Sequence, residues 1–232
     1  MRDNDLTPLV HAATQRLVRS VDALEPERWT QPSALPGWTR AHVIAHLTLN
    51  AEALAGVLAG VTAGSPVAMY PSQEARDADI AALATSSRRE LRDRLLASTT
   101  DLAQAAAHVP DPAWSTLVER VPGGTRSFPA DAVPSMRLRE VEIHHVDLDA
   151  GYRHTDWPLE FAEHLVDAMT ARSAPTPGVV VVASDLDRTW AWGDGGPRVT
   201  GPVRALGWWL TGRGDGADLT SDSGWLPRLE TL

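Results

Sequence analysis

Two pairs of side chains in this sequence have the residue types and the spacing to bind a metal ion. Glu140 and His144 are four residues apart in the segment RLREVEIHHVDLDAG, whose pattern predicts a helix. His42 and His46 have the same spacing far upstream. Residues four apart lie on one face of a helix, so each pair projects together. His145 points about a quarter-turn away from His144 and does not join that face.

Three ligands drawn from histidine and glutamate, with one coordination position left open, are the pattern of a catalytic zinc site. The spacing alone also fits a plainer interpretation, in which Glu140 and His144 form a surface hydrogen bond and the upstream histidines are core residues. The flanking residues favour the metal site. Leu138 and Val141 flank Glu140, and His46 lies within HVIAHLTL. In such apolar surroundings a carboxylate needs a counter-charge, which a metal supplies.

Two neighbouring residues each have two possible roles. Asp147 lies seven residues past Glu140 on the same helical face. It either accepts a hydrogen bond that orients a ligand histidine or pairs with an arginine. His42 either competes with His46 as a ligand, or bonds a backbone group or lines the pocket.

The elements that carry these residues are predicted to be helices. Apolar residues at helical spacing predict four of them, approximately over residues 5–24, a long stretch after Thr39, 72–108 and 132–150. Thr39 and Ser72 are typical N-caps, and Gly151 is placed to cap the end of the fourth helix. The segment 109–131 is irregular, with room for a short strand pair. Four helices with long connections favour a bundle.

After Tyr152 the pattern changes to a small α/β arrangement. A helix over about 158–173 precedes a β-branched run, GVVVVAS, and RTWAWG, which alternates with period two. PRVTG predicts a third short strand, PVRALGWWLTGR another helix, and ADLTSDSGWL further strand. We therefore predict an α+β chain, with a four-helix bundle over 1–152, a small C-terminal α/β domain over 153–232, and the site between them.

The composition narrows the classes of function. The net charge of −9 over 232 residues disfavours nucleic acid and anionic membranes, because those partners reward clustered positive charge. No apolar run approaches the roughly 18 residues of a membrane span, and the N-terminus lacks the layout of a signal peptide. We therefore expect a cytoplasmic protein. The chain has no cysteine, and all 21 basic residues are arginine. Sulfur chemistry here must therefore use a thiol from outside the chain.

The sequence resembles the mycothiol-dependent maleylpyruvate isomerases, whose N-terminal half belongs to the DinB-like metal-binding superfamily. Four stretches carry the resemblance: GWTRAHVIAHLTLNAEAL, MYPSQEARDADI, MRLREVEIHHVDL and VTGPVRALGWWLTGRGDG. They are spread over about residues 36–216, so the resemblance covers most of the chain. The segment between about 83 and 130 matches poorly, which leaves part of the pocket wall undefined.

The resemblance implies a set of site residues. A divalent metal, zinc in the first place, would be bound by His46, Glu140 and His144, which favours His46 over His42. Glu140 marks the isomerase-type subset, because much of the superfamily uses three histidines. Iron, nickel and manganese also fit such a site to some degree. Arg213, in the C-terminal GR, matches an arginine essential in the family; alternatively it caps its helix.

Other residues are candidates for contacts with the ligands. Arg76 and Arg137 are candidates for binding a dicarboxylate or polar groups of the cofactor. Trp208 and Trp209 lie on the same predicted helix as Arg213. We expect one of them in the core and the other toward the interdomain cleft.

The implied reaction is the cis–trans isomerisation of maleylpyruvate to fumarylpyruvate in aromatic degradation. A mycothiol thiolate would add reversibly to the conjugated double bond, and a thiol cosubstrate agrees with the absence of cysteine. Two alternatives stay open: a mycothiol S-transferase that conjugates the thiol to an electrophilic metabolite, and a metal-binding stress or regulatory protein without catalysis. The expected partners are a small-molecule substrate and mycothiol, for a monomer or a small homo-oligomer.

Overall fold

The computed structural model of the chain describes residues 6–172, 178–227 and 229. The contacts within the chain divide it into two compact units, Met1–Tyr152 and Arg153–Leu232. The first unit is mainly helical and the second combines helices with a sheet, so the predicted α+β class is confirmed. The described part of the first unit contains α1 (Thr7–Asp22), α2 (Arg40–Thr62), α3 (Gln73–Leu83), α4 (Arg88–Ala107), β1 (Leu117–Glu119), β2 (Ser127–Pro129) and α5 (Val133–Asp147).

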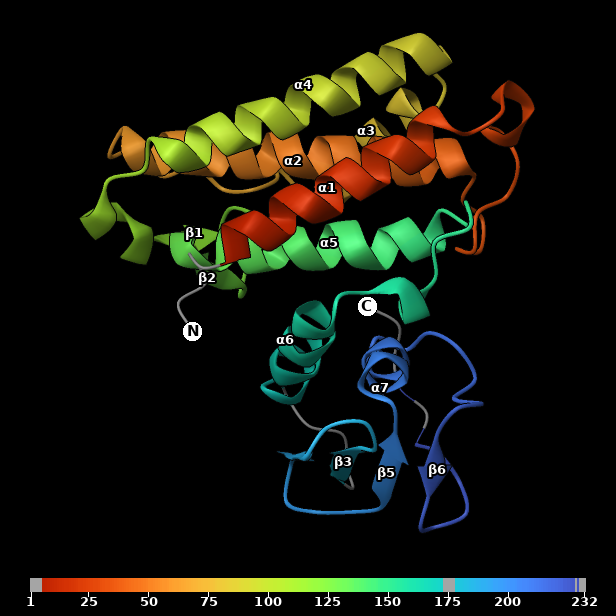
Figure 1. The fold of residues 1–232 in the computed structure, drawn as a ribbon. Coiled ribbons are helices and arrows are strands. Elements are labelled where there is room, and N and C mark those ends of the chain that lie inside the picture. Colours follow the sequence, from red (N-terminus) through yellow and green to blue (C-terminus); the bar gives the residue numbers. More distant parts are fainter. Residues whose placement is uncertain (1–5, 173–177, 228, 230–232) are drawn as a thin grey trace. The chain divides into compact units, whose positions relative to one another are not determined.

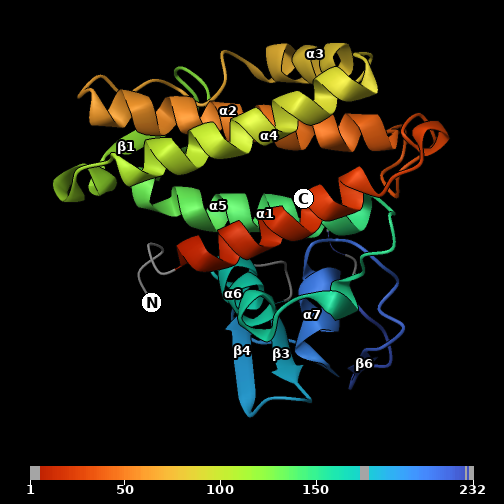
Figure 2. The ribbon, with the colours of Figure 1, turned by 45° about the horizontal axis from the view of Figure 1, so that its top comes forward.

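Helix α2 is the centre of the helical unit. It packs against α4, α3 and α5, and α1 packs on α5 (Figures 1 and 2). Because α2 has neighbours on several sides, most of its side chains are buried. It is long and apolar enough to cross a membrane, but 61% of its most apolar window is buried inside the protein. This is typical of a core helix, since each buried Leu or Val contributes about 1.5–3 kcal/mol there.

The third predicted helical stretch is two helices. Ser72 caps α3 as predicted, since its side chain accepts a hydrogen bond from the backbone of Ala75. The helix ends at Leu83, and a second capping serine, Ser87, starts α4 by accepting from the backbone of Glu90. The prediction of one helix over 72–108 was therefore wrong at this point. A serine favours a cap over a helix interior because its hydroxyl bonds the free N–H groups of a first turn.

The end of α5 also differs from the prediction. The helix ends at Asp147, before the predicted limit of 150, and Gly151 is not its cap. The backbone turns left-handed first at Asp149, with φ of 54°. The Asp149 carboxylate accepts a hydrogen bond from Arg40 at 2.6 Å, and its carbonyl also accepts from Arg40. This ion pair connects the start of α2 to the end of α5.

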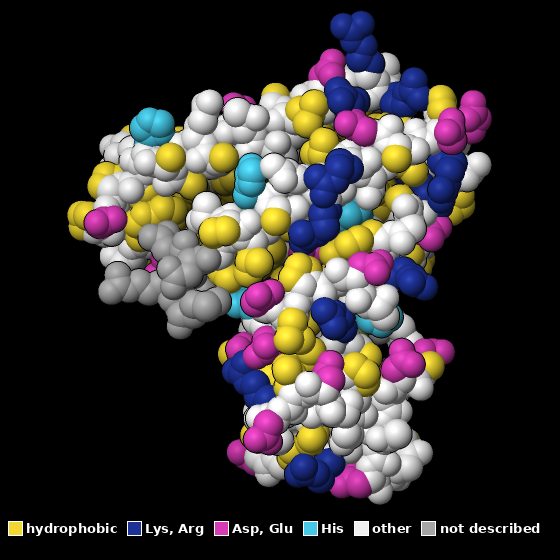
Figure 3. All heavy atoms as spheres, in the orientation of Figure 1, with side chains coloured by type: hydrophobic (Ala, Val, Ile, Leu, Met, Phe, Trp, Pro, Cys, Tyr) yellow, Lys and Arg dark blue, Asp and Glu magenta, His cyan; other side chains and the backbone are white. Residues whose placement is uncertain are grey.

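The segment between α4 and α5 is irregular, as predicted. The irregular segment contains the predicted strand pair, with β1 and β2 antiparallel. Ion pairs connect the outer faces of the helices, such as Arg92 with Asp22 at 2.6 Å and Arg94 with Glu52 at 2.6 Å. Figure 3 shows basic and acidic side chains next to one another over this unit.

The second unit is a four-stranded sheet with two helices. Its described elements are α6 (Leu159–Thr170), β3 (Val179–Ala183), β4 (Arg188–Trp192), β5 (Arg198–Gly201), α7 (Val203–Leu210) and β6 (Thr220–Ser221). The strand order is β4-β3-β5-β6, with β3 parallel to β5 and the other pairs antiparallel. Alternate residues of β3 are buried, and β3 packs against α7. The last predicted strand was too long, because only Thr220 and Ser221 pair with β5.

Candidate metal centre

The two histidines near the N-terminus of α2 have different surroundings. Thr39 caps the helix, and the His42 side chain turns back to it, with Nδ1 2.7 Å from Thr39 Oγ1 and 3.3 Å from Thr39 N. This capping box satisfies N–H groups that no helical carbonyl reaches. His42 therefore bonds a backbone group, one of the roles considered for it. His46, one turn further, is 2% exposed and points into the unit.

Helix α5 brings Glu140 and His144 to the same place. Nε2 of His46 lies 2.8 Å from Oε2 of Glu140, and Nε2 of His144 lies 3.3 Å from the same oxygen. The two imidazole rings are perpendicular, with centroids 4.6 Å apart. One ligand atom from each of the three residues lies within 4.8 Å of the others. The structure thus brings together the three residues that the resemblance selected.

The outer nitrogens of the two histidines have different partners. Nδ1 of His144 lies 2.8 Å from Oδ2 of Asp147, which is 2% exposed. This is the first of the two roles considered for Asp147. Nδ1 of His46 lies 3.2 Å from Nη2 of Arg76. Because arginine can only donate, His46 accepts at Nδ1 and carries its proton on Nε2, toward Glu140.

Burial and mutual contacts shift the pKa values of the three residues. Burial, together with the charges of His144 and Arg76, lowers the pKa of His46 to about 4, against the opposing effect of Glu140. Burial also opposes ionisation of Glu140, but His46 and His144 outweigh it and hold its pKa well below the ordinary value. Hydrogen bonds to Asp147 and Glu140 outweigh burial and raise the pKa of His144. An ionised carboxylate therefore lies beside a neutral imidazole near neutral pH.

This donor set fits a divalent cation. Two imidazole nitrogens and a carboxylate oxygen face one another, and zinc is commonly bound by such a combination. The Asp147 carboxylate is the partner that a ligand histidine usually has, because it orients the ring and increases its basicity. The same donors accept iron, nickel or manganese. The three side chains that would hold the ion are His46, Glu140 and His144.

The two candidate arginines of this unit lie in different surroundings. The side chain of Arg76 is 16% exposed, and its Nη1 donates to Asp77 at 2.7 Å. Arg137 is 1% exposed and donates from Nη1 to the Leu47 carbonyl at 2.8 Å and to Asn50 Oδ1 at 2.9 Å. Burial lowers the pKa of Arg137 to about 10, although Glu140 and Tyr70 act against this.

Three residues beside this cluster were not predicted. Trp38 packs edge-on against the His46 ring, with centroids 5.7 Å apart. Asn50 follows His46 by one helical turn in HLTLN, a spacing from which it could have been found. Tyr70 is buried beside the side chains of Asn50 and Arg76. The spacing of Tyr70 gives no sign of this position, because an irregular loop carries it.

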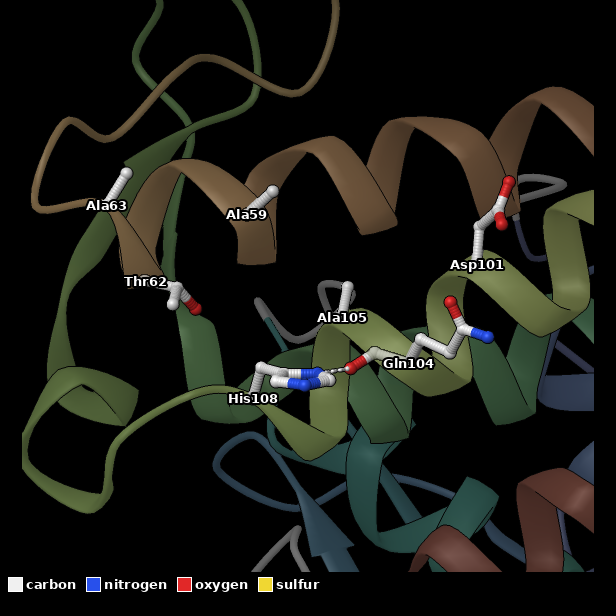
Figure 4. A pocket seen from close by; sticks show the side chains of 7 residues that line it. All are labelled: Ala59, Thr62, Ala63, Asp101, Gln104, Ala105 and His108. Atoms are coloured by element: carbon white, nitrogen blue, oxygen red, sulfur yellow. Dashed lines mark hydrogen bonds between the residues drawn. The ribbon is translucent and has the colours of Figure 1, made fainter.

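A hollow of about 360 Å³ lies next to these residues, lined by Gly37, Trp38, His42, Asp77, Ile80 and Ala81. Two of its lining residues contact the cluster: Trp38 packs against the His46 ring, and Asp77 accepts a hydrogen bond from Arg76. Another hollow, of about 400 Å³, lies between α2 and α4 (Figure 4). Its His108 bonds the Gln104 carbonyl at 2.7 Å, and none of the candidate metal ligands lines it.

Arg213 lies in the second unit, directly after α7. It is largely buried, with Nη1 3.3 Å from the Thr211 carbonyl and its guanidinium 5.8 Å from the centre of the Trp208 ring. The Thr211 contact is the one expected of a helix cap. Trp209 is buried in the core, whereas Trp208 is half-buried and stacks on His154, with centroids 5.6 Å apart. The functional role of Arg213 stays a prediction.

Comparisons with known proteins agree on one family. The family model described as "Mycothiol maleylpyruvate isomerase N-terminal domain" matches residues 10–149. A crystal structure of the mycothiol-dependent maleylpyruvate isomerase has a TM-score of 0.87 and 29% sequence identity, and covers 100% of this chain and 98% of that chain. The crystal structure of a histidine-to-alanine mutant of a mycothiol-dependent maleylpyruvate isomerase has a TM-score of 0.88 and 28% sequence identity. This match also covers 100% of this chain and 98% of that chain. No curated protein sequence gave a significant match.

Proposed function

The chain belongs to the mycothiol maleylpyruvate isomerase family, and from this premise we propose that it isomerises maleylpyruvate to fumarylpyruvate with mycothiol as thiol cosubstrate and a zinc ion held by His46, Glu140 and His144. Membership of the family makes the chain an enzyme. The observation that carries the proposal is the convergence of three ligand atoms within 4.8 Å of one another. We propose a cytoplasmic enzyme that acts on small molecules in aromatic degradation.

The chemistry needs a nucleophile from outside the chain. Rotation about a C=C bond is prohibitive, but addition of a thiolate forms a C–S bond and moves the π electrons onto the conjugated carbonyl as an enolate. The former double bond then rotates as a single bond. Elimination restores the C=C bond in trans and releases the thiolate, so the thiol is not consumed. Because the chain has no cysteine, this thiolate comes from outside the chain, and family membership supports mycothiol as its source.

Two residues of the chain, in addition to the metal ligands, have proposed roles in this reaction. A zinc ion, when bound, would lower the pKa of a coordinated thiol and increase its thiolate fraction near neutral pH. Asp147 holds the His144 ring in the orientation that turns Nε2 toward Glu140. Arg213 is proposed to neutralise a substrate carboxylate or the enolate oxygen, since a guanidinium binds both with charge-assisted hydrogen bonds.

One experiment tests the reaction directly. The zinc-loaded enzyme is mixed with mycothiol and maleylpyruvate, and both the isomers and the free thiol are followed in time. Fumarylpyruvate formation with constant thiol supports the isomerase. Loss of thiol with formation of a conjugate replaces it with the S-transferase alternative. The absence of any thiol-dependent change, in protein with a full complement of zinc, would contradict both activities.

A further inference from the structure

Three buried N–H groups near the candidate metal centre have no acceptor among the described residues. They are Nε of Arg76, Nδ2 of Asn50 and Nη2 of Arg137. A buried donor without a partner costs about 1–3 kcal/mol, so such groups in a native protein call for an explanation. Here they come from three different elements, α3, α2 and α5. Contacts link them, because Arg137 donates to Asn50 and Tyr70 lies beside both Asn50 and Arg76.

These contacts fix the direction of the free donors. Arg137 can only donate, so its bond to Asn50 identifies Oδ1 as the acceptor and leaves the Nδ2 donor on the other side of the amide. The Tyr70 hydroxyl lies beside the Asn50 amide and the Arg76 guanidinium. Arg76 in turn contacts His46 of the candidate centre. Through Arg76 this chain of contacts reaches His46, one of the three candidate ligands.

Arg76 has one edge available for a planar anion. Asp77 holds Nη1, while on the opposite edge Nη2 contacts His46 and Nε has no acceptor among the described residues. If His46 binds a metal through Nε2, the ring carries its proton on Nδ1 and no longer accepts from Arg76. Both N–H groups of this edge then need an acceptor. A carboxylate matches them with two parallel hydrogen bonds.

The charges around this place favour an anion as well. The carboxylate of Glu140 is engaged by two histidines, and a divalent cation would more than neutralise it. Arg137 is buried and forms no ion pair within the described residues. Glu140 is the carboxylate that acts on this charge, and once a divalent cation neutralises Glu140 the buried Arg137 has no counter-charge, which is unfavourable. An incoming carboxylate would supply the negative charge.

We infer that Arg76, Tyr70 and Asn50 form a carboxylate-binding site beside the metal centre, in which the Nε/Nη2 edge of Arg76 receives one carboxylate of a cis-unsaturated dicarboxylate substrate. Arg137 is a positioning residue that holds the Asn50 amide in place. The identification of the ligand as the reaction's electrophile rests on the proposed function, whereas the site itself rests on the unpartnered donors. All of these residues belong to the first unit.

The probe for this site is maleate, titrated by calorimetry into zinc-loaded enzyme without thiol, so that no turnover occurs. Arg76→Gln should weaken maleate binding about tenfold or more, because a charge-assisted bidentate contact is lost. Tyr70→Phe, which removes only a hydroxyl, should weaken binding by a smaller factor. Arg120→Gln is the matched control, since Arg120 lies 5.5 Å from the centre of the same Tyr70 ring but contributes no donor to the site.

Zinc content and thermal unfolding are measured for each variant, so that loss of metal or of fold is recognised. Maleate affinity within about twofold of wild type in Arg76→Gln and Tyr70→Phe overturns the inference, because the donors then bind only water or the anion binds the metal alone. Undetectable binding of maleate by wild type in the millimolar range also overturns it. Arg76-dependent binding by an enzyme that does not isomerise maleylpyruvate would support the inference and contradict the proposed function. Normal isomerisation with an unchanged KM in Arg76→Gln would support the proposed function and contradict the inference.

Discussion

Nδ1 of His144 lies 2.8 Å from Oδ2 of Asp147, three residues further along α5. A carboxylate at this distance holds a proton on Nδ1, so Nε2 is the nitrogen that would bind a cation. His46 has the opposite arrangement, because a guanidinium donates to its outer nitrogen. The two histidines therefore differ before any ion arrives: His144 is oriented for coordination, whereas His46 must exchange its tautomer and lose Arg76.

Replacement of Asp147 should weaken zinc binding while the three ligands stay in place. Asp147→Asn removes the negative charge that makes His144 basic, and loss of such a partner typically lowers metal affinity about 10- to 100-fold. The measurement is a zinc titration against a chelator of known affinity. Asp149→Asn is the control, since Asp149 pairs with Arg40 and does not contact the ligands. Equal zinc affinity of Asp147→Asn and wild type would show that the hydrogen bond does not support the metal.

Substitution of the two histidines of α2 should have different effects on zinc content and stability. His46→Ala removes a candidate ligand, so zinc content and thiol-dependent activity should fall together. His42→Ala should keep zinc and activity but lose about 1 kcal/mol of stability, because His42 contributes to the capping box of α2. Metal analysis and chemical unfolding measure both properties. Full zinc content in His46→Ala would remove His46 from the ligand set.

Zinc affinity should fall as the pH is lowered, with a slope that identifies the proton released. The pKa of His144 is raised above 6.5, so the metal-free protein carries a proton there that zinc must displace. The pKa of His46 is lowered to about 4, so this ring is already neutral at higher pH. Between about pH 5 and 6.5 the affinity should therefore decrease about tenfold per pH unit, with one proton released per zinc ion.

The measurement is the zinc affinity at several pH values in buffers of equal ionic strength. A slope of two would mean that His46 is also protonated in this range. A constant affinity would mean that His144 has lost its raised pKa or does not bind the ion.

Much of this arrangement could be predicted from local sequence signals. Thr39 and Ser72 cap their helices because a hydroxyl after a loop satisfies the first-turn N–H groups, and this depends on few neighbours. The i,i+4 spacing was sufficient to place Glu140 and His144 on one face. The choice of His46 over His42 needed the family resemblance, because both lie on the same helix at equivalent spacing.

What the sequence did not predict depends on contacts between distant segments. The break before Ser87 is an exception, because its cap is local: the Ser87 hydroxyl accepts from the backbone N–H of Glu90. It was not predicted because a serine also occurs inside helices and does not by itself mark a helix start. The place of Tyr70 beside Asn50 depends on how a loop folds onto α2, which no periodic pattern encodes. The pairing of Arg40 with Asp149 joins residues far apart in the chain, and Asp149 is also the left-handed residue that follows α5.

Replacement of Arg213 separates a role in catalysis from a role in the helix. If its guanidinium stabilises a substrate carboxylate or the enolate, Arg213→Ala should keep zinc and lower kcat about 100-fold or more, as loss of an oxyanion donor does. If it only caps α7 through the Thr211 carbonyl, the variant should lose about 0.3–1 kcal/mol of stability and keep its turnover. Arg204→Ala is the matched control, because Arg204 lies on α7 and donates to the Trp157 carbonyl at 2.6 Å. Kinetics and unfolding are measured on both variants.

The guanidinium of Arg213 also lies over the Trp208 ring, so Trp208→Leu gives a second test. If the ring positions a functional Arg213, this variant should reduce turnover by a smaller factor than Arg213→Ala. If Arg213 is only a cap, turnover should stay unchanged.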